Sequence, residues 1–136
     1  MSGPAEHEAA FIRAFVTPTK RERVVELLSR PKRRREFLKT LARFGDLDPR
    51  FCVEIPSTEH SAAGIASLLR KRGAPAECYV ISEDLALDGK KMPLSEALQK
   101  IVAYGMGTLV SCIPGRLGYY EGEARGDRCL LERGAA

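Results

Sequence analysis

Apolar residues recur at helical spacing in four stretches of the chain, and each stretch opens with residues that favour a helix N-terminus. Pro18, Pro31 and Pro93 stand in the first turn, where the missing N–H of proline costs no hydrogen bond. Gly45 and Gly73 suit the left-handed position that follows a helix. The predicted helices cover residues 17–29, 31–44, 57–73 and 94–103.

Five shorter stretches are rich in β-branched, aromatic and other apolar residues and are typical of strands. Turn residues separate them, notably the Asp88-Gly89 pair and the Pro114-Gly115-Arg116 tripeptide. The predicted strands cover residues 51–55, 78–82, 108–113, 117–123 and 128–132.

The order of these elements predicts an α/β fold. The strands at 78–82 and 108–113 flank the fourth helix, so we expect them to be parallel and joined by a right-handed crossover. Short turns link the last three strands, which should form an antiparallel meander. We therefore expect a small mixed β-sheet with a C-terminal antiparallel meander, covered by about four helices and preceded by a basic helical pair. Residues 1–10 are predicted to be a flexible tail, and residues 11–136 a single domain.

Composition is that of an ordinary globular protein. With 44% hydrophobic and 29% charged residues, wholesale disorder is not expected. No apolar run approaches the roughly 20 residues that a membrane span needs, and residues 1–10 lack the apolar core of a secretory signal. Arginine outnumbers lysine and alanine is abundant, which is consistent with a GC-rich bacterial genome. We therefore expect a bacterial, cytoplasmic protein that does not bind a membrane.

The cysteines predict neither a metal site nor disulfides. Cys52, Cys78, Cys112 and Cys129 occur singly, and the chain has two histidines, so the spacing of a zinc site is missing. Single cysteines in a cytoplasmic protein are normally reduced. Cys78 and Cys112 lie in apolar runs, where a thiol acts as a small hydrophobic group. We expect four free thiols, with Cys78 and Cys112 buried, and no metal or cofactor.

The positive charge is concentrated in one segment. The chain carries +4, but residues 20–43 hold ten basic and three acidic residues, an excess of +7 that leaves −3 elsewhere. Lys32, Arg35, Lys39 and Arg43 recur at steps of three and four on the polar side of the second helix. This stripe could bind nucleic-acid phosphates or an acidic protein, although a solvated helix face is the simpler interpretation. Arg34 falls on the apolar side, so it must reach solvent, pair with a carboxylate or bind a ligand.

A second hypothesis places a small-molecule site at an end of the sheet. Glu83 and Asp84 follow the strand at 78–82, where they could bind Mg²⁺ or share a proton. Glu59 and His60 precede the third helix, and His60 could act as a general base. Arg116 stands on a tight turn, where it could bind a carboxylate or phosphate. Helix capping, loop folding and hairpin geometry explain the same residues without a ligand.

Neither hypothesis is decided by a motif. The chain contains no GxGxxG, GxxxxGK[ST], HExxH or GxSxG, so whether it is an enzyme stays open. We favour a binding module whose basic helical pair docks an acidic partner, nucleic acid or protein. Tyr119 and Tyr120 should point to opposite faces of a strand, so at least one should be exposed or lie at an interface. We also expect a homodimer formed through the C-terminal meander.

Overall fold

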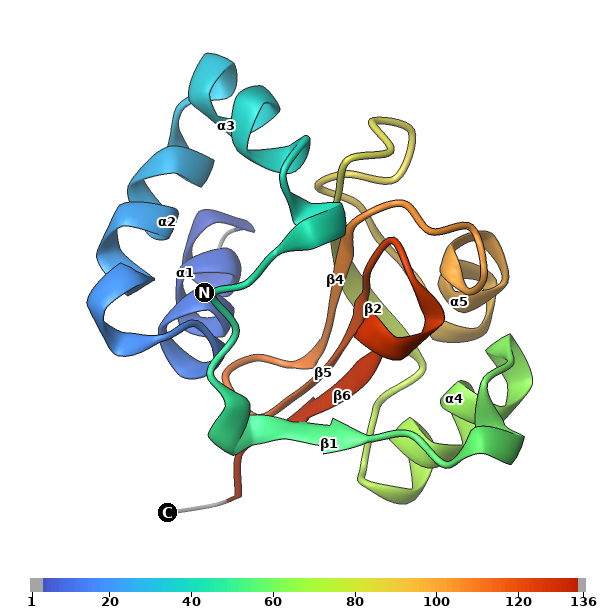
Figure 1. Ribbon diagram of the computed structural model, residues 1–136. Helices are drawn as coiled ribbons and strands as arrows, with labels where there is room; N and C mark the ends of the chain where they lie inside the picture. Colours follow the sequence, from blue (N-terminus) through green and yellow to red (C-terminus); the bar gives the residue numbers. More distant parts are fainter. Residues whose placement is uncertain (1–3, 135–136) are drawn as a thin grey trace.

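Helices cover both faces of one antiparallel sheet in the computed structural model, which describes residues 4–134 (Figure 1). Within that range the strands are β1 (Cys52–Glu54), β2 (Glu77–Ser82), β3 (Lys91–Pro93), β4 (Thr108–Ile113), β5 (Leu117–Glu121) and β6 (Cys129–Glu132). The α-helices are α1 (Pro4–Phe15), α2 (Arg21–Ser29), α3 (Pro31–Leu38), α4 (Ala62–Lys71) and α5 (Leu94–Ile101). Single 3-10 turns connect them: η1 (Pro18–Lys20), η2 (Leu41–Arg43), η3 (Pro49–Phe51), η4 (Ser57–Glu59) and η5 (Arg125–Asp127). The α/β class predicted from the sequence is confirmed.

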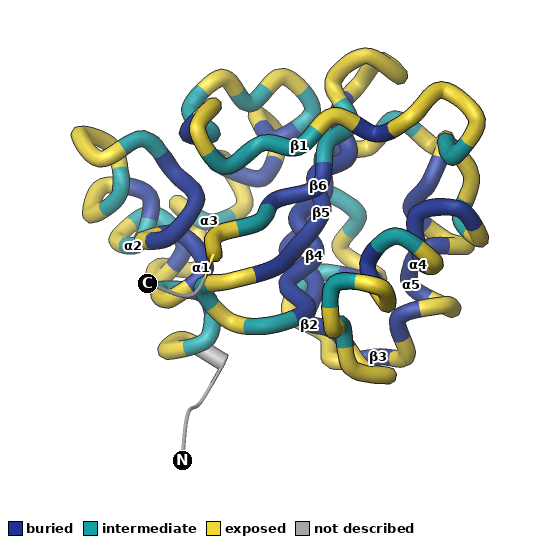
Figure 2. Tube along the Cα trace, turned by 90° about the horizontal axis from the view of Figure 1, so that it is seen from below, coloured by how far each residue is buried: buried dark blue, intermediate teal, exposed yellow. Residues whose placement is uncertain are grey.

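The sheet separates two hydrophobic cores (Figure 2). Helices α1, α2 and α3 cover one face, and α4 and α5 cover the other. Along β2, the side chains of Cys78 and Val80 join the core under α4 and α5, whereas those of Tyr79 and Ile81 join the opposite core. Because both faces are covered, β2 and β4 are apolar along most of their length instead of alternating with polar residues.

The central strand pair is antiparallel, so the predicted parallel crossover and the mixed sheet are wrong. The strand order is β1-β6-β5-β4-β2-β3, and β2 runs against β4 with Ser82 opposite Thr108. The cause is β3, a three-residue strand in a segment whose pattern predicts a loop. It folds back on β2 with Cys78 opposite Met92 and thereby reverses the chain before α5. Strands β2 and β4 are nonetheless neighbours, and β4, β5 and β6 form the predicted antiparallel meander.

Residues 4–10, whose polar composition predicts a flexible tail, form the first turns of α1. The helix continues through Phe11, Ile12 and Phe15, whose side chains are fully buried. Glu8, one turn before Ile12, is also buried because it forms an ion pair with Arg34 inside the fold. The acidic residues of this segment therefore belong to a packed helix, and α1 contributes to the core on its face of the sheet.

The second predicted helix ends six residues early, at Leu38. The hydroxyl of Thr40 donates a hydrogen bond to the carbonyl of Phe37 at 2.6 Å, and this tight turn leads into η2. Gly107 lies directly against the backbone of η2, which fixes the turn against the beginning of β4. The predicted basic stripe is therefore divided, since Lys32 and Arg35 lie on α3 and the rest follows it.

Tyr119 and Tyr120 are both buried within the single chain, at 0% and 3% exposed, so the expectation that one of them is exposed or lies at an interface is wrong. Strand β5 lies in the interior of the sheet, between β6 and β4, and one tyrosine joins each core. The edges of the sheet are β1 and β3. Strand β5 therefore offers no free edge to a second copy of the chain.

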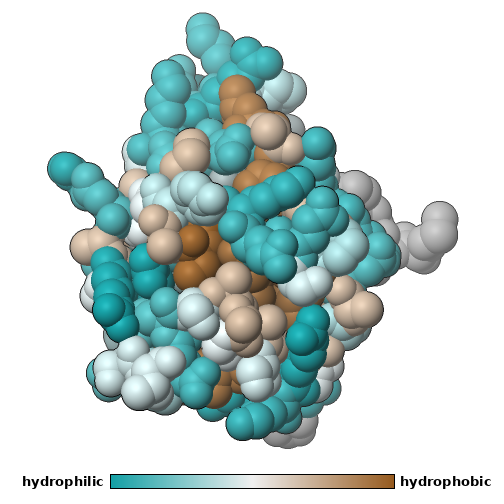
Figure 3. All heavy atoms as spheres, turned by 90° about the vertical axis from the view of Figure 1, so that its right-hand side faces the viewer, coloured by the Kyte–Doolittle hydropathy of each residue, from teal (hydrophilic) through white to brown (hydrophobic). Residues whose placement is uncertain are grey.

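The side of the molecule formed by α4 and α5 shows apolar side chains at the surface between polar ones (Figure 3). The large apolar residues that are most exposed in the described range are Leu85, Tyr104 and Met106. They lie in the loops that follow β2 and precede β4. Within residues 4–134, no helix is long and apolar enough to span a bilayer.

The close contact at Gly107 gives a test of the fold. A Cβ atom added there would overlap the backbone of Leu41 and Ala42. We expect Gly107→Ala to lower the free energy of unfolding by about 2 kcal/mol or more, since backbone must move to admit the methyl group. Gly126→Ala is the matched control, because its Cβ would meet nothing within 4 Å, and urea denaturation should leave its stability nearly unchanged. Equal stability of the two variants would contradict the close approach at Gly107.

Candidate functional site

The basic segment presents a group of cations that no carboxylate neutralises. Among the described residues, six exposed cations between residues 20 and 39 have no ion-pair partner within 4.0 Å: Lys20, Arg23, Lys32, Arg33, Arg35 and Lys39. Of the three acidic residues in the segment, Glu22 is paired with Arg13 and Glu26 with Arg30, so Glu36 alone is left. We call these six residues the basic surface; it covers the outer sides of η1, α2 and α3 and the turn after α3.

Arg43, the last residue of the predicted stripe, does not belong to this surface. Its guanidinium lies 2.7 Å from the carboxylate of Glu123, which follows β5. Both side chains of this ion pair are exposed to solvent, and the hydrogen bond from Arg43 lowers the pKa of Glu123. Glu123 therefore stays ionised and offsets the charge of Arg43 near neutral pH.

Arg34 pairs with two carboxylates and is the only member of the predicted binding set that is substantially buried. Its guanidinium donates two hydrogen bonds to Glu8, both 2.7 Å, and two to Asp88, both 2.8 Å. Burial disfavours its charge, but the hydrogen bonds to Asp88 and Glu8 outweigh burial and raise the pKa of Arg34. Of the three roles that the sequence leaves open for Arg34, pairing with carboxylates is the one observed. Arg34 joins α1, α3 and the loop before β3, and it is not available to a partner.

The five residues of the predicted pocket do not come together. Glu83 follows β2 and accepts a hydrogen bond from the backbone N–H of Gly107 at 2.8 Å, and Asp84 accepts one from Ala86 within the same loop. Arg116 lies beyond the other end of β4, in the turn before β5. These groups occupy opposite ends of the central strands, so they cannot bind one small molecule together.

Glu59 and His60 lie near the start of α4, in a third place. His60 Nε2 is 3.1 Å from the carbonyl oxygen of Ile55, which fixes the ring against its own loop. The residue that caps α4 is Ser61, whose hydroxyl accepts a hydrogen bond from Gly64 at 2.9 Å. Glu59 belongs to η4, one turn earlier, and its side chain lies against Gly64.

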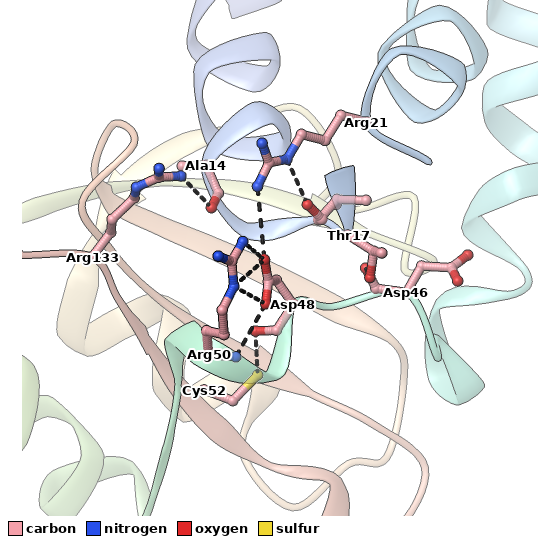
Figure 4. A network of polar contacts seen from close by, with 9 residues as sticks. Ala14, Thr17, Arg21, Asp46, Asp48, Arg50, Cys52 and Arg133 are labelled. Atoms are coloured by element: carbon pink, nitrogen blue, oxygen red, sulfur yellow. Dashed lines mark hydrogen bonds and ion pairs between the residues drawn. The ribbon is translucent and has the colours of Figure 1, made fainter. Parts of the chain in front are cut away.

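Two arginines contact the carboxylate of Asp48 (Figure 4). Arg50 lies 2.7 Å and Arg21 3.7 Å from Asp48 Oδ2, and the hydrogen bond from Arg50 lowers the pKa of Asp48. Arg133 is close by, since its guanidinium and that of Arg50 both pack over the ring of Phe51. Arg21 and Arg133 also donate to the carbonyls of Val16 and Ala14. They satisfy backbone carbonyls at the C-terminal end of α1, where a positive charge is favourable.

A cavity of about 640 Å³ opens where β2 and β4 part. The pairing of these strands ends with Tyr79 opposite Ser111. The two residues of β2 that precede Tyr79 pair with β3, on the other edge of β2, and not with β4. His7 of α1 closes one side of the cavity, with its Nε2 2.7 Å from Ser111 Oγ. The ring of His7 stacks on that of Tyr79 with centroids 4.9 Å apart. Burial lowers the pKa of His7, so the imidazole is neutral near pH 7.

The sequence pattern predicts neither the contact between His7 and Ser111 nor the cluster of arginines near Asp48. His7 and Glu8 stand in a segment whose polar composition predicts a tail, although Phe11, Ile12 and Phe15 have helical spacing that could have been extended backwards. The residues near Asp48 come from three segments that are far apart in the chain, around Arg21, Arg50 and Arg133. No local sequence pattern can therefore predict that they meet.

Comparison with known proteins finds no similar protein: no family model, no curated protein and no solved structure matches the chain.

The Arg34 ion pairs give a second test. Arg34→Met keeps much of the apolar stem but leaves Glu8 and Asp88, whose side chains are 9% and 12% exposed, without their cation. We expect a loss of about 2 to 4 kcal/mol in the free energy of unfolding, because unpaired buried charge is costly. Arg43→Met is the control: its pair with Glu123 is exposed to solvent and should contribute little to stability. Chemical denaturation measures both, and a similar small loss for the two variants would show that the Arg34 ion pairs are not needed.

The four cysteines, which are free thiols in the described chain, should react with thiol reagents at very different rates. Cys78 and Cys112 are buried as predicted, and burial raises the pKa of each thiol to about 12. A hydrogen bond with the Cys129 thiol lowers the pKa of Cys52, which is only half-buried. Since the thiolate is the reactive form, we expect iodoacetamide at neutral pH to modify Cys52 first. Peptide mass spectrometry should find Cys78 and Cys112 unmodified until the protein is unfolded, and rapid modification of either in the native protein would contradict the raised pKa of its thiol.

Proposed function

We propose that this chain is a nucleic-acid-binding module and that its basic surface is the contact face. The observation that supports the proposal most strongly is the selective pairing of charge. The arginines that hold the fold together, such as Arg34 and Arg21, have carboxylate partners, whereas the six cations of the basic surface have none within 4.0 Å among the described residues. Exposed cations without carboxylate partners can neutralise phosphates, which is the main source of affinity for nucleic acid.

The chemistry of the surface favours a duplex over a single strand. Single-strand binding relies on aromatic side chains that stack on bases, and Phe37, the aromatic residue of α3, is buried. The exposed groups are guanidinium and ammonium ions on the outside of helices, and these reach backbone phosphates. Such contacts position a protein on a duplex without reading its sequence. We therefore propose binding that depends weakly on sequence and strongly on salt.

An acidic protein is the alternative partner, because the same cations could pair with carboxylates. A small-molecule site formed by Glu59, His60, Glu83, Asp84 and Arg116 is not favoured, since these residues lie in separate places. A useful experiment must therefore distinguish nucleic acid from an acidic polypeptide.

The decisive variant replaces Lys32, Arg35 and Lys39 by alanine. We expect its affinity for a labelled DNA duplex, measured by fluorescence anisotropy at low salt, to fall for all duplex sequences alike. The slope of log K against log salt should decrease by about 0.9 for each phosphate that the variant no longer neutralises. Stability should be nearly unchanged, because exposed substitutions usually cost under about 0.5 kcal/mol each. Arg43→Ala should have a smaller effect than Lys39→Ala, because Glu123 already offsets the charge of Arg43.

The control is a second triple variant, which also removes three positive charges. Arg70, Lys71 and Lys90 are exposed and have no ion-pair partner within the described residues, but they lie outside the basic surface. Replacing them by alanine should leave duplex affinity close to that of the wild type. The proposal fails if the wild type does not bind DNA or RNA duplexes at low salt, or if both triple variants lose the same affinity. Binding of polyglutamate without binding of nucleic acid would identify an acidic protein as the partner class.

A further inference from the structure

We propose that Ser111 is a nucleophile, activated by His7, that takes the acyl group from small esters entering the cavity between β2 and β4. This activity is independent of the basic surface, which lies on other elements. Three parts of the molecule support it: a hydroxyl, a base in contact with it, and a cavity that admits a small molecule to both.

The cavity exists because the sheet is interrupted at Ser111. The ladder between β2 and β4 ends at this residue, and the register between β4 and β5 shifts between Ser111 and Ile113. The strand ends diverge, and the space of about 640 Å³ between them lies within the range of ligand pockets. Ser111 is 1% exposed, so only a molecule small enough to enter this space can reach its hydroxyl.

His7 meets the geometric requirement for a general base. A base must lie within about 2.6 to 3.2 Å of the group whose proton it accepts, and Nε2 of His7 is 2.7 Å from Oγ of Ser111. The groups that face His7 are Glu8 on its own helix, Tyr79 on β2 and Lys91 on β3. Burial and Lys91 lower the pKa of His7, Glu8 acts in the opposite direction, and the net pKa lies below 6.5. The imidazole is therefore in the form that can accept a proton at neutral pH.

The ring of His7 is held by contacts that lead into the ion pairs of Arg34. It stacks on Tyr79 at an angle of 27°, and the hydroxyl of Tyr79 donates a hydrogen bond to Glu8 at 2.6 Å. Glu8 is in turn fixed by its two hydrogen bonds from Arg34. A base whose orientation is set in advance loses less entropy when the reaction begins. This support distinguishes the His7–Ser111 contact from a hydrogen bond between two mobile side chains.

The reaction that these groups can perform is acyl transfer in two steps. Ser111 Oγ attacks the carbonyl carbon of the ester, an Oγ–C bond forms, and the hydroxyl proton moves to His7 Nε2. The ester C–O bond then breaks, and the proton passes from His7 to the departing alcohol. In the second step a water molecule gives a proton to His7 Nε2 and attacks the acyl carbon. The Oγ–C bond breaks, the proton passes from His7 to Oγ, and a carboxylic acid leaves as the serine hydroxyl is restored. Lys91 and Glu77, which form an ion pair with N and O 3.7 Å apart, both line the cavity.

The experiment uses the whole chain and p-nitrophenyl acetate, a small activated ester. We expect rapid release of about one equivalent of p-nitrophenol, and peptide mass spectrometry should place one acetyl group on Ser111. Ser111→Ala should abolish this acetylation, whereas Ser67→Ala, which removes an exposed serine of α4, should not affect it. His7→Phe keeps a ring to stack on Tyr79 but lacks the nitrogen, so it should remain folded by circular dichroism and lose at least 100-fold in acetylation rate.

The pH dependence separates this reaction from nonspecific acetylation. The rate should rise as His7 loses its proton, with a midpoint below pH 6.5, and should be level above neutral pH. Acetylation of lysines would instead increase steadily into the alkaline range. The proposal is wrong if the acetyl group is found only on lysines or on Cys78 or Cys112, which line the same cavity, or if His7→Phe reacts like the wild type.

Discussion

A buried positive charge needs partners, and the way in which Arg34 is supplied with them determines much of this structure. Glu8 comes from α1 and Asp88 from the loop before β3, and the guanidinium of Arg34 holds both through two hydrogen bonds each. Removing Arg34 would leave both carboxylates buried without their cation. The requirement therefore ties the N-terminal helices to the middle of the sheet, and Tyr79, which is 71 residues from Glu8 in the chain, joins the same group through its hydrogen bond to that carboxylate.

The same ion pairs orient two other parts of the molecule. Because α3 is attached through Arg34, its remaining cations face outward, and Lys32, Arg33 and Arg35 are exposed. Because α1 is attached through Glu8, the preceding residue His7 is brought onto Ser111 at the end of β4. One arginine in the middle of a basic run thus acts as an anchor while its neighbours form a surface. The sign and number of the charges do not distinguish these roles; only their partners do.

Local pattern predicts most of the elements but not the long-range pairing. The helical spacing near α2, α4 and α5 and the apolar runs of β2 and β4 are sufficient to locate those elements and to predict that β2 and β4 are neighbours. The direction of β4 is not predictable in this way, because it depends on β3, a strand of three residues that is too short to give a recognisable sequence pattern. The end of α3 is not predictable either, because a close approach of Gly107, far along the chain, decides it. Among the candidate site residues, the exposed positions Lys32, Arg35 and Lys39 follow from helical spacing. The partners of Arg34 and Arg43 and the position of His7 do not, because each depends on residues that only the folded chain brings together.

The order of strands in the sheet also has a consequence for the synthesis of the protein. Strand β1 pairs only with β6, and Cys52 of β1 lies opposite Leu131. A growing chain that has passed β1 must therefore wait for residues 129–132 to leave the ribosome before this edge of the sheet can form. Until then β5 presents an unpaired edge as well, since β6 is its neighbour on that side. The interval during which exposed strand edges could pair with other nascent chains is thus set by the last strand to be translated, and pairing across long sequence separation makes this closure slow.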